Sequence, residues 1–117
     1  MPFQSLLDGL IRDVPGARAA LLLDATGEVA LESGAREERH RLVAAYHGIA
    51  LGAAQRASAR HGRGAVHEIL TRYERGQVLL QALKDGYYLV LLLGPGANPA
   101  LGRHRLGPAR VRMNQEL

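Results

Sequence analysis

The chain has no cysteine and no tryptophan, and it is poor in both aromatic residues and lysine. The missing cysteine excludes disulfides, thiolate nucleophiles and cysteine-based zinc sites. Phe3 is the only phenylalanine and Lys84 the only lysine. With 47% hydrophobic but only 4% aromatic residues, the core must be built mainly from Leu, Val and Ala. No apolar run reaches the roughly 18 residues that a transmembrane helix needs, so we expect no membrane insertion.

The length of 117 residues is that of one ordinary domain, and we expect residues 1–117 to form it. Residues 1–16 carry Asp8 and Asp13 and lack a basic leader, so we expect no signal peptide and a cytoplasmic location. The net charge is +4. Basic residues gather between Arg56 and Arg63, but aromatic residues for base stacking are scarce, so we expect no nucleic-acid partner.

The clearest local signal is a hairpin between residues 78 and 93. Two apolar runs, Val78 to Leu83 and Tyr87 to Leu93, are separated by Lys84, Asp85 and Gly86. Asp-Gly between such runs predicts a tight turn, because the turn needs positive φ and glycine adopts it without steric cost. The second run is almost uninterrupted, which predicts a central strand with helices on both faces.

Hydrophobic spacing and turn residues place the other elements. Asn98 and Pro99 are suited to start a last helix, in which Leu101 and Leu106 should face inward, and Gly107-Pro108 should kink or restart it. The order predicts an α+β fold: a five-stranded antiparallel sheet with helices on both faces. The expected ranges are helices at 3–14 and 37–60, strands at 17–24, 29–32, 66–73, 78–83 and 87–93, and a helix after residue 98.

The long helix carries two parallel stripes. One is apolar, with Leu42, Tyr46, Ile49 and Ala53. Beside it lie the small residues Ala44, Gly48 and Gly52, four apart. Glycine inside a helix costs about 1 kcal/mol relative to alanine, so a second backbone must approach closely. That backbone belongs either to the chain's own sheet or to a second copy of the chain, and the residues alone favour neither.

Catalytic groupings are absent from the sequence. His40 and His47 share a helical face, but no carboxylate completes a metal triad at ligand spacing. Gly94-Pro95-Gly96 lies between a strand and a helix but lacks the Lys-Ser/Thr of a P-loop, and Pro95 removes a donor. We therefore expect no catalytic residue, no cofactor and no metal, and a protein that is not an enzyme.

Taken together, the chain resembles the Roadblock/dynein light-chain domain family over essentially its whole length. The match rests on the order and spacing of several short stretches, and Gly107-Pro108 departs from the family's continuous last helix. The matching stretches are Val14 to Leu31, Leu42 to Ala45, Gly76 to Leu80, Asp85 to Val90, and Ala97-Asn98.

The resemblance implies a profilin-like fold and a homodimer. Family members pair their third strands edge to edge into one continuous sheet and set their long helices side by side. The resemblance thereby favours a second copy of the chain as the close neighbour of Ala44, Gly48 and Gly52. The implied dimer interface is Ala44, Gly48, Gly52, Val66, Glu68 and Leu70.

The resemblance also implies function: a non-catalytic regulator or platform for a small Ras-like GTPase. Two alternatives stay open, a homodimeric scaffold or adaptor without effect on nucleotide turnover, and a small-molecule sensor domain, against which the dense Leu/Ala core argues. An arginine finger from the long helix is conceivable, but we expect indirect action on the partner's switch loops. The candidate contact residues for the GTPase are Arg39, Arg41, His47, Gln55 and Arg56.

Overall fold

The computed structural model describes residues 3–117, and its elements follow the expected order from helix to helix. Across these residues, no helix combines the length and the apolar character that crossing a bilayer requires. The boundaries lie within a few residues of those expected from sequence. The elements are α1 (Phe3–Asp13), β1 (Ala17–Leu23), β2 (Val29–Gly34), α2 (Glu38–Arg60), β3 (Glu68–Tyr73), β4 (Gly76–Ala82), β5 (Tyr88–Leu93) and α3 (Pro99–Glu116).

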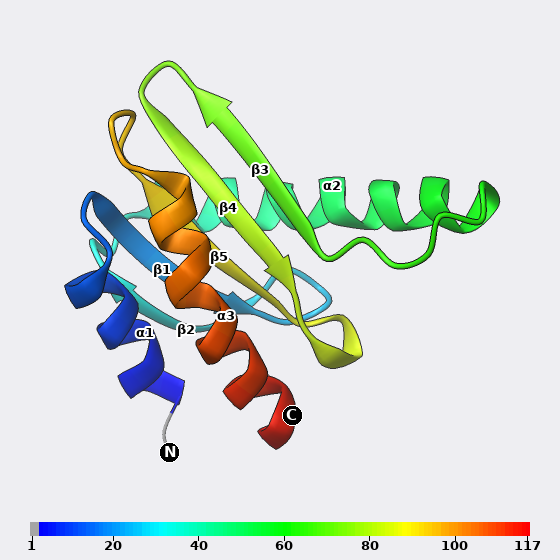
Figure 1. The fold of residues 1–117 in the computed structure, drawn as a ribbon, viewed down its shortest axis with the longest axis horizontal. Coiled ribbons are helices and arrows are strands. Elements are labelled where there is room, and N and C mark those ends of the chain that lie inside the picture. Colours follow the sequence, from blue (N-terminus) through cyan, green and yellow to red (C-terminus); the bar gives the residue numbers. More distant parts are fainter. Residues whose placement is uncertain (1–2) are drawn as a thin grey trace.

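The five strands form one sheet in the order β2-β1-β5-β4-β3, and every neighbouring pair is antiparallel. Helices α1 and α3 cover one face of the sheet, and α2 crosses the other (Figure 1). The predicted α+β architecture is therefore confirmed. Strands β2 and β3 are the two edges, and the outer edge of β3 has no strand partner within residues 3–117.

Two hydrophobic cores lie on either side of the sheet, and β5 serves both. Every residue of β5 is buried. Leu89, Leu91 and Leu93 point to the core beneath α1 and α3, whereas Val90 and Leu92 point to the core beneath α2. The period of two along a strand produces this division, and it explains why an uninterrupted apolar run is required here.

The turn between β4 and β5 has the predicted geometry. Asp85 has φ 60° and ψ 30°, and Gly86 has φ 81°. The amide of Leu83 donates to the carbonyl of Tyr87 at 2.8 Å, and the amide of Tyr87 donates to the carbonyl of Lys84 at 3.2 Å. Positive φ at both central residues is the backbone twist that continues smoothly into the two strands.

Helix α3 begins as predicted but does not break. The Asn98 side chain accepts a hydrogen bond from the amide of Ala100 at 2.9 Å, which caps the first turn. Of the two expected alternatives at Gly107-Pro108, the restart is wrong, because one helix runs from Pro99 to Glu116, and the kink stays a prediction. Pro108 lies on the exposed side, while Leu106, Ala109 and Met113 are buried before and after it and hold both halves on the sheet.

The inward face of α3 also corrects one expectation. Leu106 is fully buried as predicted, but Leu101 is 46% exposed. Gly102 takes the inward position instead, and a Cβ there would lie 3.2 Å from a methyl group of Leu91. The helix therefore sits close to β5 at its first turn because a glycine faces the strand.

Candidate functional site

The outer face of α2 is an exposed apolar stripe. Leu42, Tyr46 and Ile49 are 51%, 67% and 65% exposed, and Ala53 continues the line. Their spacing of four, three and four residues keeps them on one side of the helix. Large apolar side chains exposed side by side on a small domain mark a surface that binds another protein.

The small-residue stripe faces the other way, onto the chain's own sheet. Ala44 is fully buried. A Cβ on Gly48 would overlap the phenol ring of Tyr88 in β5. The prediction that Ala44 and Gly48 contact a second copy is corrected here, because their close neighbours belong to the same chain: the core beneath α2 for Ala44 and the Tyr88 side chain for Gly48. Gly52 meets only the side chain of Arg56, so it stays a predicted interface residue.

The segment before β3 also differs from expectation. Val66 was predicted to belong to the third strand and to the interface. Instead, the Gln55 side chain binds it on both sides: the Val66 amide donates to Oε1 at 2.8 Å, and Nε2 donates to the Val66 carbonyl at 2.9 Å. Both backbone groups of Val66 are thus occupied. Gln55, predicted to contact a GTPase, is used to tie this loop to α2.

Within β3, the two other predicted interface residues point toward α3. The Glu68 carboxylate accepts from Arg103 and from Gln81, each at 2.9 Å. These hydrogen bonds lower the pKa of Glu68, although partial burial acts in the opposite direction and is the largest single influence. Leu70 packs against the core beneath α1 and α3. A partner at this edge would therefore meet the backbone of β3 and the flanks of these side chains.

His47 is the second correction among the predicted GTPase contacts. It is 6% exposed, and its Nδ1 lies 2.8 Å from the carbonyl oxygen of Val43. Its Nε2 lies 3.3 Å from the hydroxyl of Tyr73, and the two rings meet edge to face. His47 therefore joins α2 to the end of β3 rather than projecting outward.

The three predicted arginines are held in different ways. Arg41 makes a forked ion pair with Glu32 of β2, which lowers the pKa of that carboxyl. Arg39 is largely exposed and pairs with the neighbouring Glu37. Arg56 is exposed and has no ion pair within residues 3–117. Arg39 and Arg56 stand about 25 Å apart along the helix axis, so they act at separate points.

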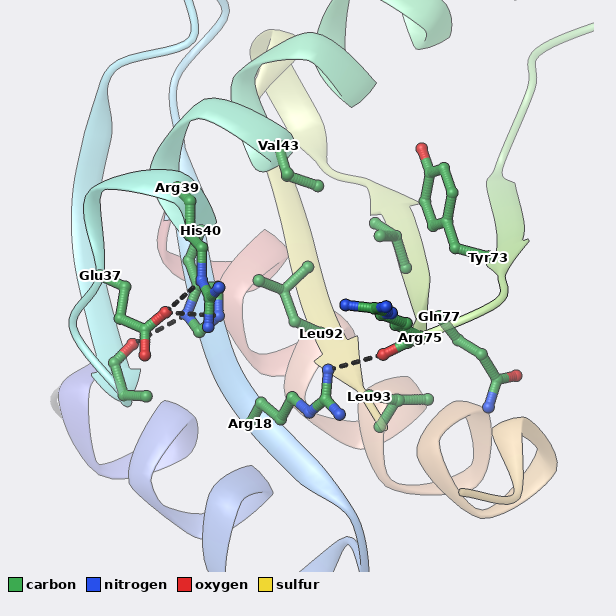
Figure 2. A pocket seen from close by; sticks show the side chains of 13 residues that line it. Arg18, Glu37, Arg39, His40, Val43, Tyr73, Arg75, Gln77, Leu92 and Leu93 are labelled. Carbon is green, nitrogen blue, oxygen red and sulfur yellow. Dashed lines mark hydrogen bonds and ion pairs between the residues drawn. The ribbon is translucent and has the colours of Figure 1, made fainter. Parts of the chain in front are cut away.

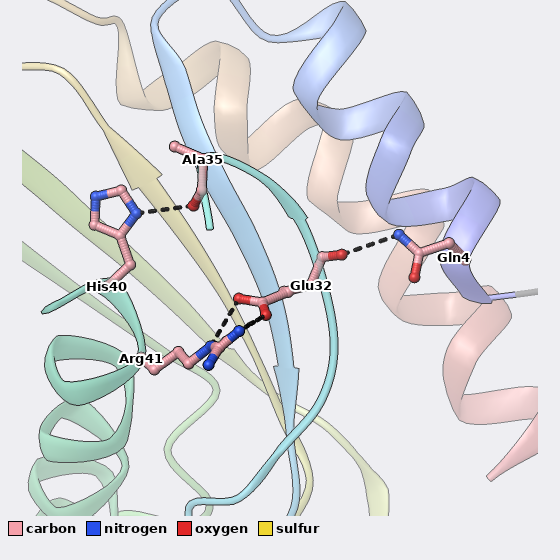
Figure 3. A network of polar contacts seen from close by, with 5 residues as sticks. All are labelled: Gln4, Glu32, Ala35, His40 and Arg41. Atoms are coloured by element: carbon pink, nitrogen blue, oxygen red, sulfur yellow. Dashed lines mark hydrogen bonds and ion pairs between the residues drawn. The ribbon is translucent and has the colours of Figure 1, made fainter. Parts of the chain in front are cut away.

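A polar network fixes the first turns of α2 against the β2 edge (Figure 3). Gln4 of α1 donates to the carbonyl of Glu32 at 3.0 Å, on the same residue that holds Arg41. His40 Nδ1 lies 3.1 Å from the carbonyl oxygen of Ala35 in the preceding loop. The apolar stripe is thus displayed on a helix that Arg41 anchors to β2, and β2 is in turn held by Gln4 of α1.

A hollow of about 760 Å³ opens between the start of α2 and the turn joining β3 to β4 (Figure 2). Val43, Val78 and Leu92 form its apolar side. Arg18 crosses its rim and donates to the carbonyl of Arg75 at 2.9 Å. Sequence reasoning missed this hollow, because Arg18 and Arg75 are 57 positions apart and no local pattern joins them.

Exposed Tyr73, at 54%, links the hollow to the β3 edge. Apolar stripe, hollow and open strand edge therefore adjoin on one side of the molecule. Within residues 3–117, no three His, Asp or Glu side chains come together as metal ligands. The arrangement is that of a binding surface: apolar side chains and backbone groups presented outward on anchored elements.

Comparison with known proteins gives a family and a set of similar structures. The Roadblock/LC7 domain model matches residues 3–93. A Roadblock/LC7 domain structure from Streptomyces avermitilis has a TM-score of 0.86 and 21% identity, covering 97% of this chain and 95% of that one. Myxococcus xanthus MglB has a TM-score of 0.85 and 15% identity, covering 97% and 92%.

The gliding protein MglB from Thermus thermophilus is similar to the same degree. It has a TM-score of 0.84 and 21% identity, covering 98% of this chain and 90% of that one. At such identities these structures support the fold alone. None of the curated proteins compared with the chain matches its sequence.

Proposed function

This chain belongs to the Roadblock/LC7 domain family, and from that premise we propose that it is a non-catalytic, homodimeric regulator or platform for a small Ras-like GTPase. The family match and the MglB-like fold support a role among small-GTPase regulators. A GTPase partner also implies a cytoplasmic location. The single observation that carries the proposal is the exposed apolar stripe of α2 beside the open β3 edge.

Self-association through β3 follows from the chemistry of that edge. An unpaired strand exposes a row of amide and carbonyl groups, and pairing with a second copy satisfies them. A two-fold axis through the middle of β3 joins the two sheets and places both α2 helices on the same face. The C-terminal half of α2 reaches past the sheet (Figure 1). Antiparallel pairing brings this half toward Tyr73 and the hollow of the second copy.

The GTPase then docks on the paired α2 helices. Leu42 and Tyr46, in the first half of α2, supply apolar contact, and Arg39 and Arg56 supply positive charge at two separate points. Since Arg41 is bound to Glu32 and His47 is buried, no cluster of cationic side chains converges on one atom. The surface is therefore suited to ordering the partner's switch loops rather than to supplying a catalytic arginine.

That same observation favours the second candidate, an adaptor without effect on nucleotide turnover. Both functions use one surface, and they differ only in what the bound GTPase does. The sensor alternative has less support, because the leucines and valines of β4 and β5 fill both cores.

The experiment captures GTPases from a lysate and then measures their rate of GTP hydrolysis. Immobilised protein is exposed to native lysate in the presence of GDP or of a non-hydrolysable GTP analogue, and each recovered GTPase is purified and assayed with and without the protein. Nucleotide-dependent capture that Tyr46→Arg abolishes supports the α2 surface. A changed turnover rate then identifies a regulator, and an unchanged rate an adaptor. Capture of no GTPase in either nucleotide state contradicts the proposal.

A further inference from the structure

Helix α3 has a strongly basic outer face on the side of the sheet opposite α2. From Asn98 to Gln115 the sequence contains no Asp or Glu. The helix also lies beyond residues 3–93, which the family model matches. Its charge is therefore a property of this chain that membership of the family does not explain. The cationic side chains are Arg103, Arg105, Arg110 and Arg112.

Helical geometry arranges these side chains in rows. The buried residues of α3 set its inward direction, and His104 and Val111 lie on the opposite line. Leu101 and Pro108 lie between this line and the side that carries Arg105 and Arg112. Leu101 and Val111 are 46% and 49% exposed. Arginines flank this line at intervals of seven residues, which is about two turns. Arg103 and Arg110 lie on one side, and Arg105 and Arg112 on the other.

Most of this charge is uncompensated. Arg103 is paired with Glu68 of β3. Arg105, Arg110 and Arg112 make no ion pair or side-chain hydrogen bond with the rest of residues 3–117. Arg105 acts electrostatically on the Asp13 carboxylate of α1, which is already bound by Arg12, and Glu116 follows Arg112 by about one helical turn. Three guanidinium groups are thus left to bind an external anion.

We propose that the outer face of α3 docks on the surface of an anionic phospholipid bilayer. Guanidinium groups bind phosphate oxygens in a bidentate manner. Two rows of guanidinium groups on either side of exposed aliphatic side chains match a plane of lipid headgroups. Leu101 and Val111 would enter the headgroup layer, and the aliphatic stems of the arginines would lie along the interface. The face is a convex ridge, which suits a plane of lipid headgroups. It carries no Phe, Tyr or Trp for stacking nucleic-acid bases.

The strength of this contact depends on copy number, and in that respect it rests on the proposed dimer. Each arginine near an anionic bilayer raises partitioning by about fivefold, so three in one protomer give about a hundredfold. Pairing through β3 places both α3 helices on the same side of the continuous sheet. The second helix then binds at a high effective concentration. The opposite side of the sheet stays open for the partner of α2.

The test is cosedimentation of the full chain with vesicles at low ionic strength. We expect binding to mixed phosphatidylcholine–phosphatidylglycerol vesicles, little binding to pure phosphatidylcholine, and loss of binding as salt is raised. Replacement of Arg105, Arg110 and Arg112 by Gln should lower partitioning by about a hundredfold in each protomer. The matched control replaces Arg36, Arg60 and Arg63 by Gln, which removes the same charge away from α3 and should leave most of the binding.

Three outcomes overturn the proposal. One is that the unmodified chain does not sediment with the anionic vesicles. Another is that the control triple variant loses as much binding as the α3 triple variant. The third is that polyglutamate or an oligonucleotide, at equal charge concentration, competes fully for the α3 face, which would show that it binds anionic polymers without preference for a bilayer. Sedimentation velocity without lipid tests the dimer separately. If the unmodified chain is monomeric but binds the vesicles, and the substitutions in α3 abolish that binding, then the dimer is refuted and the lipid contact is not.

Discussion

Gly48 of α2 lies directly against the phenol ring of Tyr88 in β5, and no side chain fits between them. The phenol is almost completely buried, and burial raises the pKa of its hydroxyl. The glycine thus lets α2 approach the sheet closely and display its opposite, apolar side to other proteins.

This contact predicts a difference between two glycines of the same helix. Gly48→Ala should destabilise the domain by about 1–3 kcal/mol, the usual cost of overpacking a core, partly offset by the better helix propensity of alanine. Gly52→Ala is the matched control, because its Cβ would meet only the flexible Arg56 side chain, and it should be neutral or stabilising by up to about 1 kcal/mol. Urea denaturation measures both. Equal effects would show that the Tyr88 contact does not set the requirement for glycine.

The same contact shows where sequence reasoning reached its limit. A row of small residues on a helix indicates that a backbone approaches, but not which one. Tyr88 is 40 positions from Gly48, and only the tertiary fold brings them together. Resemblance to the family favoured the second copy, whereas the structure places Ala44 and Gly48 against the sheet. The apolar stripe, also visible in the sequence, is left for a partner.

Local signals were more reliable. The Asp85-Gly86 turn, the Asn98 cap and the alternation along β5 depend on neighbouring residues, so their positions followed from the sequence. The continuity of α3 could not be predicted from the sequence, because the packing of Leu106 and Met113 on the sheet outweighs the helix break that Pro108 favours. Gln55 and His47 were misplaced for a similar reason. A polar residue on a helix looks exposed in a sequence until the loop or strand that it binds is known.

A second prediction concerns acid stability. The forked ion pair from Arg41 lowers the pKa of Glu32 below its ordinary value. The ion pair therefore stabilises the fold above about pH 4.3, the ordinary pKa of Glu, and this contribution is lost as the pH falls through the lower pKa of the folded state. Arg41→Gln should cost about 1 kcal/mol or less at neutral pH, since Arg41 is partly exposed, and the cost should shrink as the pH falls and Glu32 becomes protonated.

The measurement is the difference in free energy of unfolding between the two proteins across that pH range. Taking the difference removes the contributions of Asp8, Asp24 and Glu68, whose pKa values are also lowered. Arg39→Gln serves as the control, because its pair with Glu37 is exposed and should contribute little. A difference that is the same at neutral and acid pH would mean that Arg41 acts through packing rather than charge.

The proposed dimer gives a third prediction. Ile49→Arg places a charge at the middle of α2, where the half that reaches toward the second copy begins, so it should raise the dimer dissociation constant by at least about tenfold while leaving monomer stability within about 0.5 kcal/mol. Val111→Arg is the matched control, an exposed aliphatic residue on the opposite side of the molecule. Sedimentation velocity over a range of concentrations measures the association. An unmodified chain that is monomeric throughout, or a control that dissociates equally, would contradict the assignment of this surface.

The last prediction concerns how a GTPase approaches α2. Arg39 and Arg56 are exposed on the helix, and Ras-like GTPases often carry acidic patches around their switch regions, so opposite charges should accelerate encounter more than they strengthen the final complex. Replacing both arginines by Glu should lower the association rate constant by about tenfold at low salt, with a smaller effect near physiological salt and little change in dissociation. Arg41 is left unchanged, because reversing its charge would break the ion pair with Glu32.

Stopped-flow or surface-based kinetics with the recovered GTPase measure both rate constants. The matched control replaces Arg105 and Arg112 by Glu, which changes the net charge equally on the opposite face. If long-range attraction depended only on total charge, both double variants would slow association to the same extent, whereas docking on α2 requires a larger effect from Arg39 and Arg56. An unchanged association rate for the α2 variant at low salt would move the docking site to the face that carries α1 and α3.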